Sequence, residues 1–391
     1  MRILFCNYEY PPIGGGGGVV NAALAEELAK RHEVTVLTSR AFDLPAETVQ
    51  NGVRILRVPV FFRRRRSSAN FPSMLAYLPM GTCAGYRLLR KSKFDIINTH
   101  FALPTGIVGH ALARGSGIPN VLSVHGGDLY DPSKRLSPHR VALFRFVVRR
   151  LALAADAIVA QSGDTLANLH RYYAPEAEGA IIPLGIPRPA PVRASRSKLG
   201  FAEDDVILVT IGRLVARKAV HQLIESLAHF NDRRVKLIVI GSGPLTETLT
   251  AKAEQCGVRS QVIFTGRVEE SVKGELLSIA DMFVSTSQHE GFGLVFLEAM
   301  AAGLPVVCYD RGGQNDFLKD GEVGCVVPLN DHSTFTERCQ QLIASPGLRQ
   351  RLGARNKSRV ERYFIDRCAE AYESLFESLV GQAARTQVDT P

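Results

Sequence analysis

Short, continuous apolar runs alternate with helical patterns along this chain, and that alternation is typical of a parallel α/β sheet. In the first half the runs stay apolar over consecutive positions, which indicates strands buried on both faces. After the first run, Ala and Leu recur on one face over residues 19–31, which predicts a helix. The strands predicted in this half are residues 2–7, 34–39, 53–60, 94–100, 120–125, 157–162 and 180–185.

A second series of alternating strands and helices follows a segment that has neither a helical nor a strand-like pattern. Residues 187–197, PRPAPVRASRS, are rich in Pro and Arg and predict a linker between domains. Near the end of the chain, residues 361–380 predict a helix, and residues 381–391 are expected to form a frayed tail. The second series predicts strands at 206–212, 235–241, 262–266, 282–287, 305–309 and 324–328, and helices at 221–230, 245–257, 275–280 and 294–303.

These patterns predict an α/β fold of two Rossmann-like, doubly wound parallel-sheet domains that face a central cleft. We expect the first domain to cover residues 1–188 and the second residues 189–360, with residues 361–391 packing back on the first. A chain of 391 residues is too long for one ordinary core, which also favours two domains. Because such sheets bind ligands at the carboxyl ends of their strands, residues that directly follow strands are the candidates for chemistry.

Composition narrows the class of protein. The seven Cys are scattered without C-x-x-C spacing, which favours reduced thiols in a cytoplasmic protein and gives no support to a metal site. No run of 18 apolar residues occurs, and the N-terminal run MRILFCNYEYPP lacks the features of a secretory signal. We therefore expect neither a membrane span nor secretion.

The net charge of +9 is concentrated in two basic patches with apolar residues between the charges. These patches are FFRRRR (61–66), which contains Arg63–Arg66, and HRVALFRFVVRR (139–150), which we expect to be a basic helix. Each is either a solvated face or a contact with an anionic membrane surface, in which case the protein would be peripheral on the inner face of the membrane. No nucleic-acid motif accompanies the charge, so nucleic acid is not an expected partner.

Five glycines, residues 14–18, separate the first strand from the first helix. Their backbone can approach a ligand closely, and Gly17 and Gly18 lie where free N–H groups at a helix start favour an anion. A dinucleotide site is the rival interpretation, but the glycine spacing reaches Val19 and no acidic residue ends the second strand. Arg40 at that strand end keeps an NADP-dependent oxidoreductase open as an alternative.

Cationic and titratable residues follow other predicted strands. Arg213 and Lys218, in TIGRLVARKA, suit a diphosphate that gains charge as it leaves, although ordinary surface basicity is the alternative. His125 directly follows a strand in SVHGGDLYD, where it could hydrogen-bond a substrate or share a proton, although most single His residues are structural. The chain has no D-x-D and no metal-type His spacing, so no metal is expected.

Two carboxylates lie in the apolar stretch SQHEGFGLVFLEAMAAGLPVV. Glu290 is in a glycine-rich turn, and a helix is predicted to begin near Leu294, where free N–H groups can receive phosphate oxygens. Glu298 lies within that helix. Both carboxylates could accept hydrogen bonds from the hydroxyls of sugar and ribose rings. The alternatives are a helix-dipole charge for Glu290 and a salt-bridged helix residue for Glu298, and the apolar surroundings disfavour the second.

The combined motifs resemble a known family. The glycine loop, HGGD, GRL…RK, GSGP, FTGRV and EGFGLVFLEAMAAGLPVV together resemble the retaining nucleotide-sugar glycosyltransferases of family 4, which have the GT-B fold. The resemblance covers nearly the whole chain, and the last motif is the most specific. It implies a first domain that binds the acceptor and a second domain that binds a nucleoside diphosphate sugar, with a UDP- or GDP-sugar as the donor. It also implies catalysis without a metal or any other cofactor.

The resemblance also implies roles for individual residues. Glu290 would bind the sugar hydroxyls of the donor and Glu298 its ribose, while His125 would contact the sugar near the reacting carbon. Arg213 and Lys218 would hold the diphosphate. The other implied donor contacts come from glycines and backbone groups, namely Gly17, Gly18, Gly241, Gly243, Arg267, Val268, Gly291, Phe292, Gly293 and Leu294.

Three positions depart from the family pattern. Ala219 follows the cationic Lys218 where Gly is common, and Asp316 stands where Glu is commoner. His289, directly before the first carboxylate, occupies a variable position. No residue suits the role of covalent nucleophile, so we expect a same-face displacement in which the leaving phosphate takes the acceptor proton. Closure about the 187–197 linker would assemble the site.

The sequence thus predicts a retaining hexosyltransferase of glycan or polysaccharide biosynthesis. Its acceptor would be a hydroxyl of a glycan, a lipid-linked glycan or a small molecule. Residues 61–80, interpreted as a loop rich in Arg, Phe and Met, suit a lipid-linked or anionic acceptor. Besides the oxidoreductase, the alternatives are a nucleotide-sugar epimerase of the same fold and a catalytically silent glycan- or membrane-binding subunit.

Overall fold

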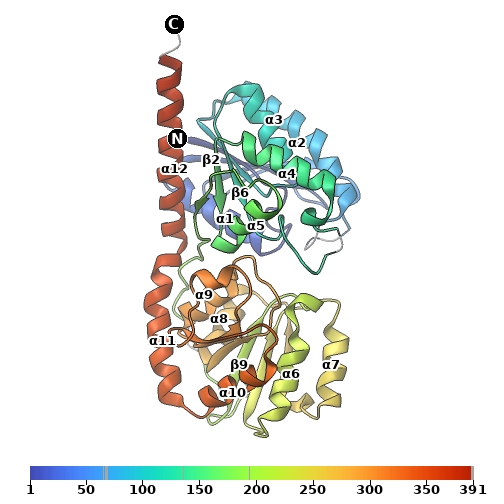
Figure 1. The fold of residues 1–391 in the computed structure, drawn as a ribbon, viewed down its shortest axis with the longest axis vertical. Helices are drawn as coiled ribbons and strands as arrows, with labels where there is room; N and C mark the ends of the chain where they lie inside the picture. The colour runs from blue at the N-terminus through green and yellow to red at the C-terminus, as the bar shows by residue number, and fades with distance from the viewer. Residues whose placement is uncertain (65, 67–68, 135, 193, 389–391) are drawn as a thin grey trace. The chain divides into compact units, whose positions relative to one another are not determined.

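The structure is a computed structural model that describes residues 1–64, 66, 69–134, 136–192 and 194–388. The chain forms two compact units: the first comprises Met1–Pro187 and Phe364–Pro391, and the second comprises Arg188–Tyr363. Each unit is built on one largely parallel sheet with helices on both of its faces (Figure 1). The predicted fold class, two parallel-sheet α/β domains, is therefore confirmed.

The sheet of the first unit has the strand order β3-β4-β2-β1-β5-β6-β7-β8, and all neighbours pair in parallel except β3 and β4. Every strand predicted in this half is present. The sequence pattern misses β3, because its four residues, ETVQ, are largely exposed and form no apolar run. The strands are β1 (Arg2–Cys6), β2 (Glu33–Arg40), β3 (Glu47–Gln50), β4 (Val53–Pro59), β5 (Ile96–His100), β6 (Asn120–Val124), β7 (Ala157–Ala160) and β8 (Ala180–Ile181).

Helices cover both faces of this sheet. The α-helices described in the first unit are α1 (Gly16–Ala29), α2 (Phe71–Lys91), α3 (Thr105–Ser116), α4 (Ala142–Ala154), α5 (Gly163–Tyr172) and α12 (Ile365–Val388). On β1, Ile3 and Phe5 pack with α1 and α12, whereas Leu4 and Cys6 pack with α2 and α3. All four side chains are fully buried, so the prediction of strands buried on both faces is confirmed.

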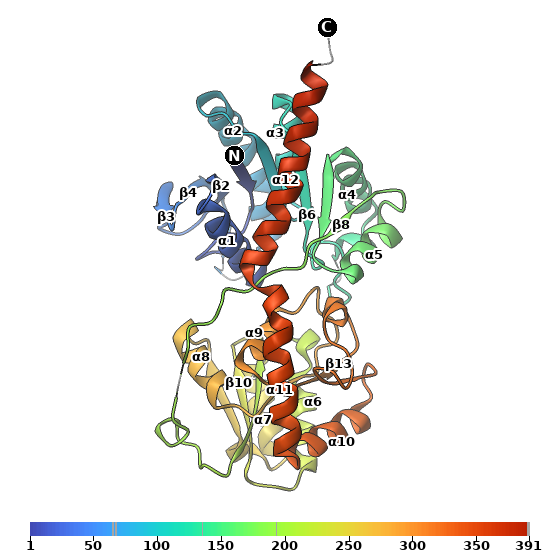
Figure 2. The same cartoon turned by 90° about the vertical axis from the view of Figure 1, so that its left-hand side faces the viewer.

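The last helix belongs to the first unit although the second unit precedes it in the chain. The chain re-enters through a parallel bridge between Ile186 and Phe364. From there α12 runs alongside α1 and the sheet (Figure 2). Its buried side chains, which include Tyr372 and Phe376, pack in the same core as those of α1 and the sheet. Gly185 lies beside this crossing, where an added Cβ would come within 2.6 Å of the Cα of Ile365.

Three predicted boundaries are wrong. The segment 61–80 is not one loop, because α2 begins at Phe71, where Asn70 and Ser73 form a capping box. Pro79 lies inside α2 and hides the helix from a reading of the sequence. The first helix begins at Gly16 rather than residue 19. The expected frayed tail is helical to Val388, because residues 382–388 include good helix formers such as Gln, Ala and Arg and contain no Pro.

The second unit holds a six-stranded, wholly parallel sheet in the order β11-β10-β9-β12-β13-β14, and each of its strands was predicted. The strands are β9 (Val206–Ile211), β10 (Val235–Ile240), β11 (Val262–Gly266), β12 (Met282–Ser285), β13 (Val306–Tyr309) and β14 (Gly324–Val327). The α-helices described here are α6 (Val220–His229), α7 (Thr246–Gln255), α8 (Glu270–Ile279), α9 (Leu294–Ala302), α10 (His332–Ile343) and α11 (Pro346–Val360).

The helices of the second unit also form two layers. Side chains of α6, α7 and α10 share one core with the sheet, to which α11 adds Leu348 and Leu352, while α8 and α9 lie on the other face of the sheet (Figure 1). The loops that leave the carboxyl ends of β9, β10, β11, β12 and β13 therefore gather at one edge of the sheet. That edge holds the charged residues that the sequence singles out.

Candidate active site

Glu290 is the centre of the charged cluster in the second unit. Its carboxylate is buried, with only 9% of the side chain exposed. Lys218 Nζ forms an ion pair with Glu290 Oε1, and Arg217 Nη1 lies 3.3 Å from Glu290 Oε2. A buried carboxylate without a partner is costly, and these two cations compensate its charge.

The two cations determine the protonation state of Glu290. Burial alone raises the pKa of the carboxyl, but the positive charges of Lys218 and Arg217 outweigh burial and lower the pKa from 4.5 to about 2. The carboxylate is therefore ionised at neutral pH. It can accept hydrogen bonds, and it has no proton to give as a general acid.

Hydrogen bonds to the backbone fix the turn that carries Glu290 at two points. The amide of Gly313 donates to the carbonyl of Glu290 at 2.8 Å, and Glu290 forms a parallel bridge with Gly312. Gly312 has a φ of +119°, and a Cβ there would lie 2.1 Å from the Glu290 carbonyl, so only Gly fits. On the other side, the Arg217 guanidinium donates to the carbonyl of His289.

Lys218 and Ala219 end a short 3-10 turn (Ala216–Lys218) directly before α6. Ala219 adopts a φ of +46° and ψ of +34°, the left-handed conformation, and is the N-cap residue of α6. That conformation costs an L-residue roughly 1–2 kcal/mol, which explains why Gly suits the position. At this departure from the family pattern, Ala219 itself carries the cost of the left-handed conformation.

Glu298 is also ion-paired, contrary to the expectation from its apolar surroundings. Lys273 of α8 reaches it at 3.0 Å and also pairs with Glu270 at 2.7 Å. Burial raises the pKa of the Glu298 carboxyl, and Lys273 opposes that rise without cancelling it. The expectation that the apolar surroundings disfavour a salt bridge at Glu298 is therefore wrong, because Lys273 from the neighbouring helix α8 pairs with this carboxylate. Glu298 Oε2 is nevertheless buried with no hydrogen-bond partner among the described residues.

The helix start beside Glu290 is as predicted. α9 begins at Leu294 after Gly293, whose φ of +94° turns the chain, and no side chain caps the helix. Phe292 is buried against the ring of Phe317, 5.1 Å between centroids, and Gly291 connects it to the carboxylate turn. Among the described residues, no side chain therefore accepts from the first backbone N–H groups of α9.

Four further glycine and loop positions lie at the same sheet edge. A Cβ at Gly241 would lie 2.0 Å from the Gly212 carbonyl, and one at Gly243 would lie 2.2 Å from the Leu214 carbonyl. Their lack of side chains therefore serves close packing of the chain on itself, whatever ligand it approaches. Arg267 is exposed and Val268 is half-buried directly after β11.

Arg213 follows β9 at this edge and differs from Lys218 in its surroundings. It is exposed, and among the described residues no ion pair involves it. The structure therefore brings Lys218, but not Arg213, to Glu290. The guanidinium is available to a ligand that approaches from solvent.

The first unit gathers a second group of predicted residues. His125 follows β6 and is buried, with its ring 4.4 Å from that of Phe101. Phe101 in turn lies against Gly17, where a Cβ would come within 2.7 Å of the Phe101 ring. Gly18 lies one residue on, close to the carbonyl of Glu9. The glycine loop and His125 are thus neighbours through one aromatic ring.

The helix that follows the glycine loop also lacks a side-chain cap. α1 begins at Gly16 after Gly15, and its first turn contains no acidic residue. The amide of Gly15 instead donates to Glu9 Oε2 at 3.3 Å. As at α9, the positive end of the helix dipole has no compensating carboxylate in its first turn.

Comparison with known proteins assigns the family. Residues 14–188 match the family model described as Glycosyltransferase Family 4, and residues 192–359 match the model described as Glycosyl transferases group 1. The two matches together span most of the chain. This chain belongs to glycosyltransferase family 4.

Relatives and solved structures agree with that assignment. A D-inositol 3-phosphate glycosyltransferase of Xylanimonas cellulosilytica is 28% identical, over 93% of this chain and 92% of the relative. Sucrose-phosphate synthase from Thermosynechococcus elongatus shares the fold with a TM-score of 0.86 at 23% identity, covering 98% of this chain and 100% of that one. The Anabaena HepE protein in complex with UDP has a TM-score of 0.77 at 20% identity, covering 97% and 100%. The fold is accordingly GT-B.

One basic patch of this glycosyltransferase is not what the sequence suggests. Arg63, the first arginine of the 63–66 run, is buried over the ring of Tyr8 and lies 3.5 Å from Glu9 Oε1. It therefore cannot face a membrane. Arg64 and Arg66 are exposed, and Arg65 lies outside the described residues.

Three residues that contribute to this glycosyltransferase site escape sequence reasoning. Lys273 and Phe101 carry no motif of their own, and Arg217 lies in the GRL…RK motif but is given no role by it. Each acts through a partner that lies far away in the chain. Phe101 offers one local signal only in the structure, a φ of +71° that is uncommon for a bulky residue. Among the described residues, no cluster of His, Cys, Asp and Glu has the geometry to hold a metal ion.

Proposed function

We propose that this glycosyltransferase moves a sugar from a UDP- or GDP-sugar to an acceptor hydroxyl, with retention at the anomeric carbon and without a metal. The acceptor would be a glycan, a lipid-linked glycan or a small molecule. The observation that carries the proposal is the buried Glu290 carboxylate, ionised beside Lys218 and Arg217 and next to the uncapped start of α9. It combines an acceptor for sugar hydroxyls with cations and N–H groups for phosphate.

The cations have separate tasks in this proposal. When the bond between the sugar and the diphosphate breaks, negative charge develops on the leaving group, and Lys218, Arg213 and the α9 N–H groups would stabilise it. Arg217 would stay with Glu290 and keep that carboxylate compensated while Lys218 turns to phosphate. Because Glu290 has two cationic partners, Lys218 can bind the ligand while Arg217 remains paired with the carboxylate.

The two carboxylates would select the hydroxyls of the donor. Glu290 would accept from the sugar ring and Glu298 from the ribose. The buried Glu298 Oε2, which lacks a partner among the described residues, supports this assignment because a ribose hydroxyl would satisfy it. Lys273 would keep the other oxygen of Glu298 ionised and in position.

Retention would follow from a same-face displacement. The bond from the anomeric carbon to the phosphate oxygen breaks, the acceptor oxygen bonds to that carbon from the same side, and the acceptor proton passes to the leaving phosphate. Charge stabilisation rather than a covalent nucleophile would then supply the rate enhancement. Membership in family 4 supports this route over a double displacement.

A panel of UDP-, GDP- and ADP-sugars tests the proposal, with EDTA in half of the reactions. We expect slow hydrolysis of at least one α-linked donor to the α-anomer, unchanged by EDTA. Inversion at C2 of the sugar would instead indicate an epimerase, and a change in nicotinamide fluorescence with NADPH an oxidoreductase. If no donor is consumed under any condition, the silent-subunit alternative replaces the transferase.

We also propose that α4 contacts an anionic membrane surface. Among the described residues, no helix is both long and apolar enough to cross a bilayer. On α4, however, Leu143, Phe146 and Leu153 are exposed by 65%, 56% and 46%. Arg150 lies on the same face and stacks over Phe146 at 5.3 Å. Residues 143, 146, 150 and 153 follow one another at intervals of three or four, so they form one stripe along the helix, as in helices that lie on bilayers.

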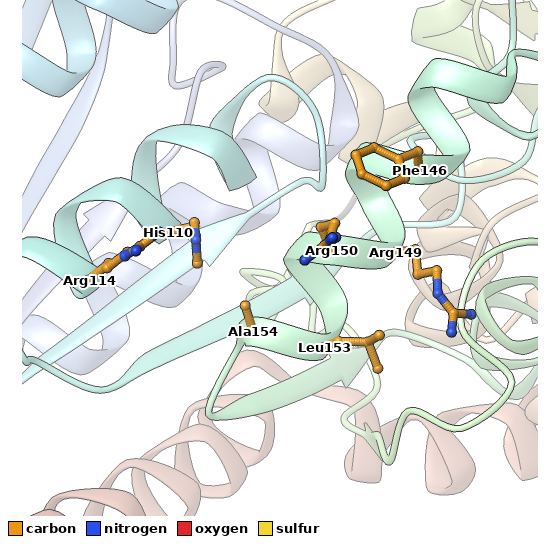
Figure 3. A pocket seen from close by; sticks show the side chains of 7 residues that line it. All are labelled: His110, Arg114, Phe146, Arg149, Arg150, Leu153 and Ala154. Atoms are coloured by element: carbon orange, nitrogen blue, oxygen red, sulfur yellow. The ribbon is translucent and has the colours of Figure 1, made fainter.

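A histidine and an arginine from a neighbouring helix extend this face. A hollow of about 680 Å³ lies between α3 and α4, lined by His110 and Arg114 from α3 and by Arg150 from α4 (Figure 3). Arg149 also lines it, but its guanidinium pairs with Glu176. Apolar side chains beside Arg114 and Arg150, which form no ion pair with any described residue, suit the boundary between acyl chains and phosphate head groups.

Co-sedimentation with lipid vesicles tests the membrane proposal. We expect the protein to pellet with phosphatidylglycerol vesicles more than with phosphatidylcholine vesicles, and Phe146→Glu to abolish the difference. Val49→Glu is the matched control, because Val49 is 73% exposed on β3, away from this stripe. Equal pelleting with both lipids, or equal loss in both variants, would remove α4 as the contact.

A further inference from the structure

A chain of buried polar side chains in the first unit leads from α12 to His125. The Tyr372 hydroxyl donates to Ser123 Oγ at 3.0 Å, and Ser123 donates to Asn98 Oδ1 at 3.1 Å. Asn98 Nδ2 lies 3.0 Å from His100 Nε2, and His100 Nδ1 lies 2.9 Å from His125 Nε2. Each of these five side chains is buried. Two sheet strands, β5 and β6, the loop after β6 and the last helix thus contribute to one hydrogen-bonded line.

The direction of the protons along this line follows from the donor inventory of each group. Burial raises the pKa of the Tyr372 hydroxyl, so Tyr372 keeps its proton and gives it to the Ser123 oxygen. The single Ser123 proton is then directed to the carbonyl oxygen of Asn98. The amide is thereby oriented with its NH₂ group toward His100 Nε2, which must accept.

An accepting Nε2 fixes the state of both imidazoles. A neutral His with a bare Nε2 carries its proton on Nδ1, so His100 donates from Nδ1 to His125 Nε2. That nitrogen of His125 accepts in turn, and its own proton must therefore sit on Nδ1. The direction of donation that is set at Tyr372 therefore leaves His125 with one N–H group, on Nδ1.

Burial keeps the two rings uncharged. It lowers the pKa of His100 well below its usual value, and the neighbouring His125 lowers it further. Burial likewise lowers the pKa of His125 to about 4, against a smaller opposing effect of the Gln161 side chain. His125 Nδ1 is itself buried and has no hydrogen-bond partner among the described residues. A buried N–H donor without a partner requires an explanation, and a ligand oxygen supplies one.

We infer that Asn98 and His100 are positioning residues that hold His125 as a neutral Nδ1–H donor aimed at an oxygen of the donor sugar. This inference rests on the proposed function, which supplies the sugar. His125 then acts as a hydrogen-bond donor and not as a general base, because its Nε2 is occupied by His100. Neutrality matters for the reaction, since an imidazolium would repel the positive charge that develops on the sugar ring.

Nitrogen NMR of the full-length protein labelled with ¹⁵N-histidine tests the inference without any ligand. Protonated and bare imidazole nitrogens have distinct shifts, and the spectra of His100→Phe and His125→Gln assign the two rings. We expect both rings to be neutral at pH 7, with Nδ1 protonated and Nε2 bare. If either ring is protonated on Nε2 or is charged, the inference that this hydrogen-bonded line holds His125 as a neutral Nδ1–H donor is wrong.

Kinetics on two variants then test its importance for the reaction. His100→Phe retains an aromatic ring against Phe5, which stacks on His100 at 5.2 Å, but removes the donor to His125. We expect a mixed tautomer at His125 and about a tenfold lower kcat for donor hydrolysis, as for a lost hydrogen bond in the transition state. Tyr86→Phe is the control, because it removes a hydroxyl of the first unit that donates to the Ala111 carbonyl and takes no part in this line, and it should change neither the tautomer nor kcat.

Retention of both the Nδ1–H state and full kcat in folded His100→Phe would remove His100 as a positioning residue. Circular dichroism checks the fold of each variant, and the wild-type spectrum decides the tautomer if a variant does not fold. The two proposals fail separately. If no nucleotide sugar is consumed while the Nδ1–H tautomers are observed, the proposed function is wrong, but the positioning of His125 by Asn98 and His100 is still supported.

Discussion

At the scale of single residues, charge compensation decides what each group near Glu290 can do. Removing one partner of a buried ion pair costs about 3–5 kcal/mol, because the other charge is left alone. Glu290 has two cationic partners, so the loss of Lys218 to a ligand still leaves Arg217 in contact. We expect this redundancy to separate the effects of Lys218 variants on activity from their effects on folding.

Ala219→Gly should stabilise the second unit. Ala219 is held at a positive φ, where an L-residue is strained by roughly 1–2 kcal/mol, and Gly is not. Part of that gain is lost because Gly gives the unfolded chain more freedom, so we expect a net increase of about 1 kcal/mol in the free energy of unfolding. Urea denaturation measures it. A decrease would mean that the methyl group of Ala219, which is buried, contributes more by packing than its backbone costs.

Acidification should destabilise the first unit through His125. Its pKa falls from 6.5 in the unfolded chain to about 4 in the folded protein, so below pH 6.5 the unfolded state binds more protons. This contribution is fully present above pH 6.5 and is lost as the pH falls toward 4. Between pH 7 and pH 5 we expect it to reduce the free energy of unfolding by about 2 kcal/mol.

The matched comparison is His125→Gln, which removes the titrating group. Urea denaturation at both pH values should show a decline with pH that is smaller in this variant by about that amount. Equal declines in the two proteins would show that His125 is not held neutral by the fold.

Sequence reasoning reaches some of these residues and not others for a physical reason. Glu290, Lys218 and His125 are predictable because each directly follows a strand or lies in a recognisable turn. Their partners are not, because Lys218 and Glu290 are 72 residues apart and His100 and His125 are 25 apart. Only the strand order of the sheet brings such pairs together. Ion pairing at Glu298 is missed for the same reason.

At the scale of elements, the buried strands are the predictable part of the fold. Their continuous apolar runs result directly from burial on both faces, as Ile3 and Leu4 show. Exposed or interrupted elements are harder, because β3 has no apolar run and α2 contains Pro79. Composition alone cannot identify α2, whose start is set by the Asn70 cap.

The role of α12 gives a prediction at this scale. Phe376 is fully buried against the sheet of the first unit, so Phe376→Ala should lower its free energy of unfolding by about 3–5 kcal/mol. Glu377→Ala, at the next and exposed position, should change it by less than about 0.5 kcal/mol. Hydrogen exchange of the β1 and β5 amides measures both. Equal protection in the two variants would mean that α12 contributes little to this core.

At the scale of the whole molecule, the two units hold different parts of the proposed chemistry. The second carries the charges, Glu290 with Lys218 and Arg217, and the first carries the neutral His125. In the proposed reaction, the anionic leaving group needs the cations of the second unit, whereas the sugar that becomes cationic needs a neutral donor such as His125. The fold class follows from the alternation of strands and helices, whereas this division of charge emerges only from the contacts.

Turnover of α-linked nucleotide sugars by three proteins tests the central claim most directly. The proteins are the wild type, Lys218→Ala, and Lys319→Ala as a control that removes an exposed lysine of the same unit. The account predicts release of the α-configured sugar by the wild type and an unchanged rate in Lys319→Ala. It predicts a rate lower by about 10²–10³ in folded Lys218→Ala, since that variant lacks one stabiliser of the leaving group. Release of the β-anomer, or equal rates in all three proteins, would contradict it.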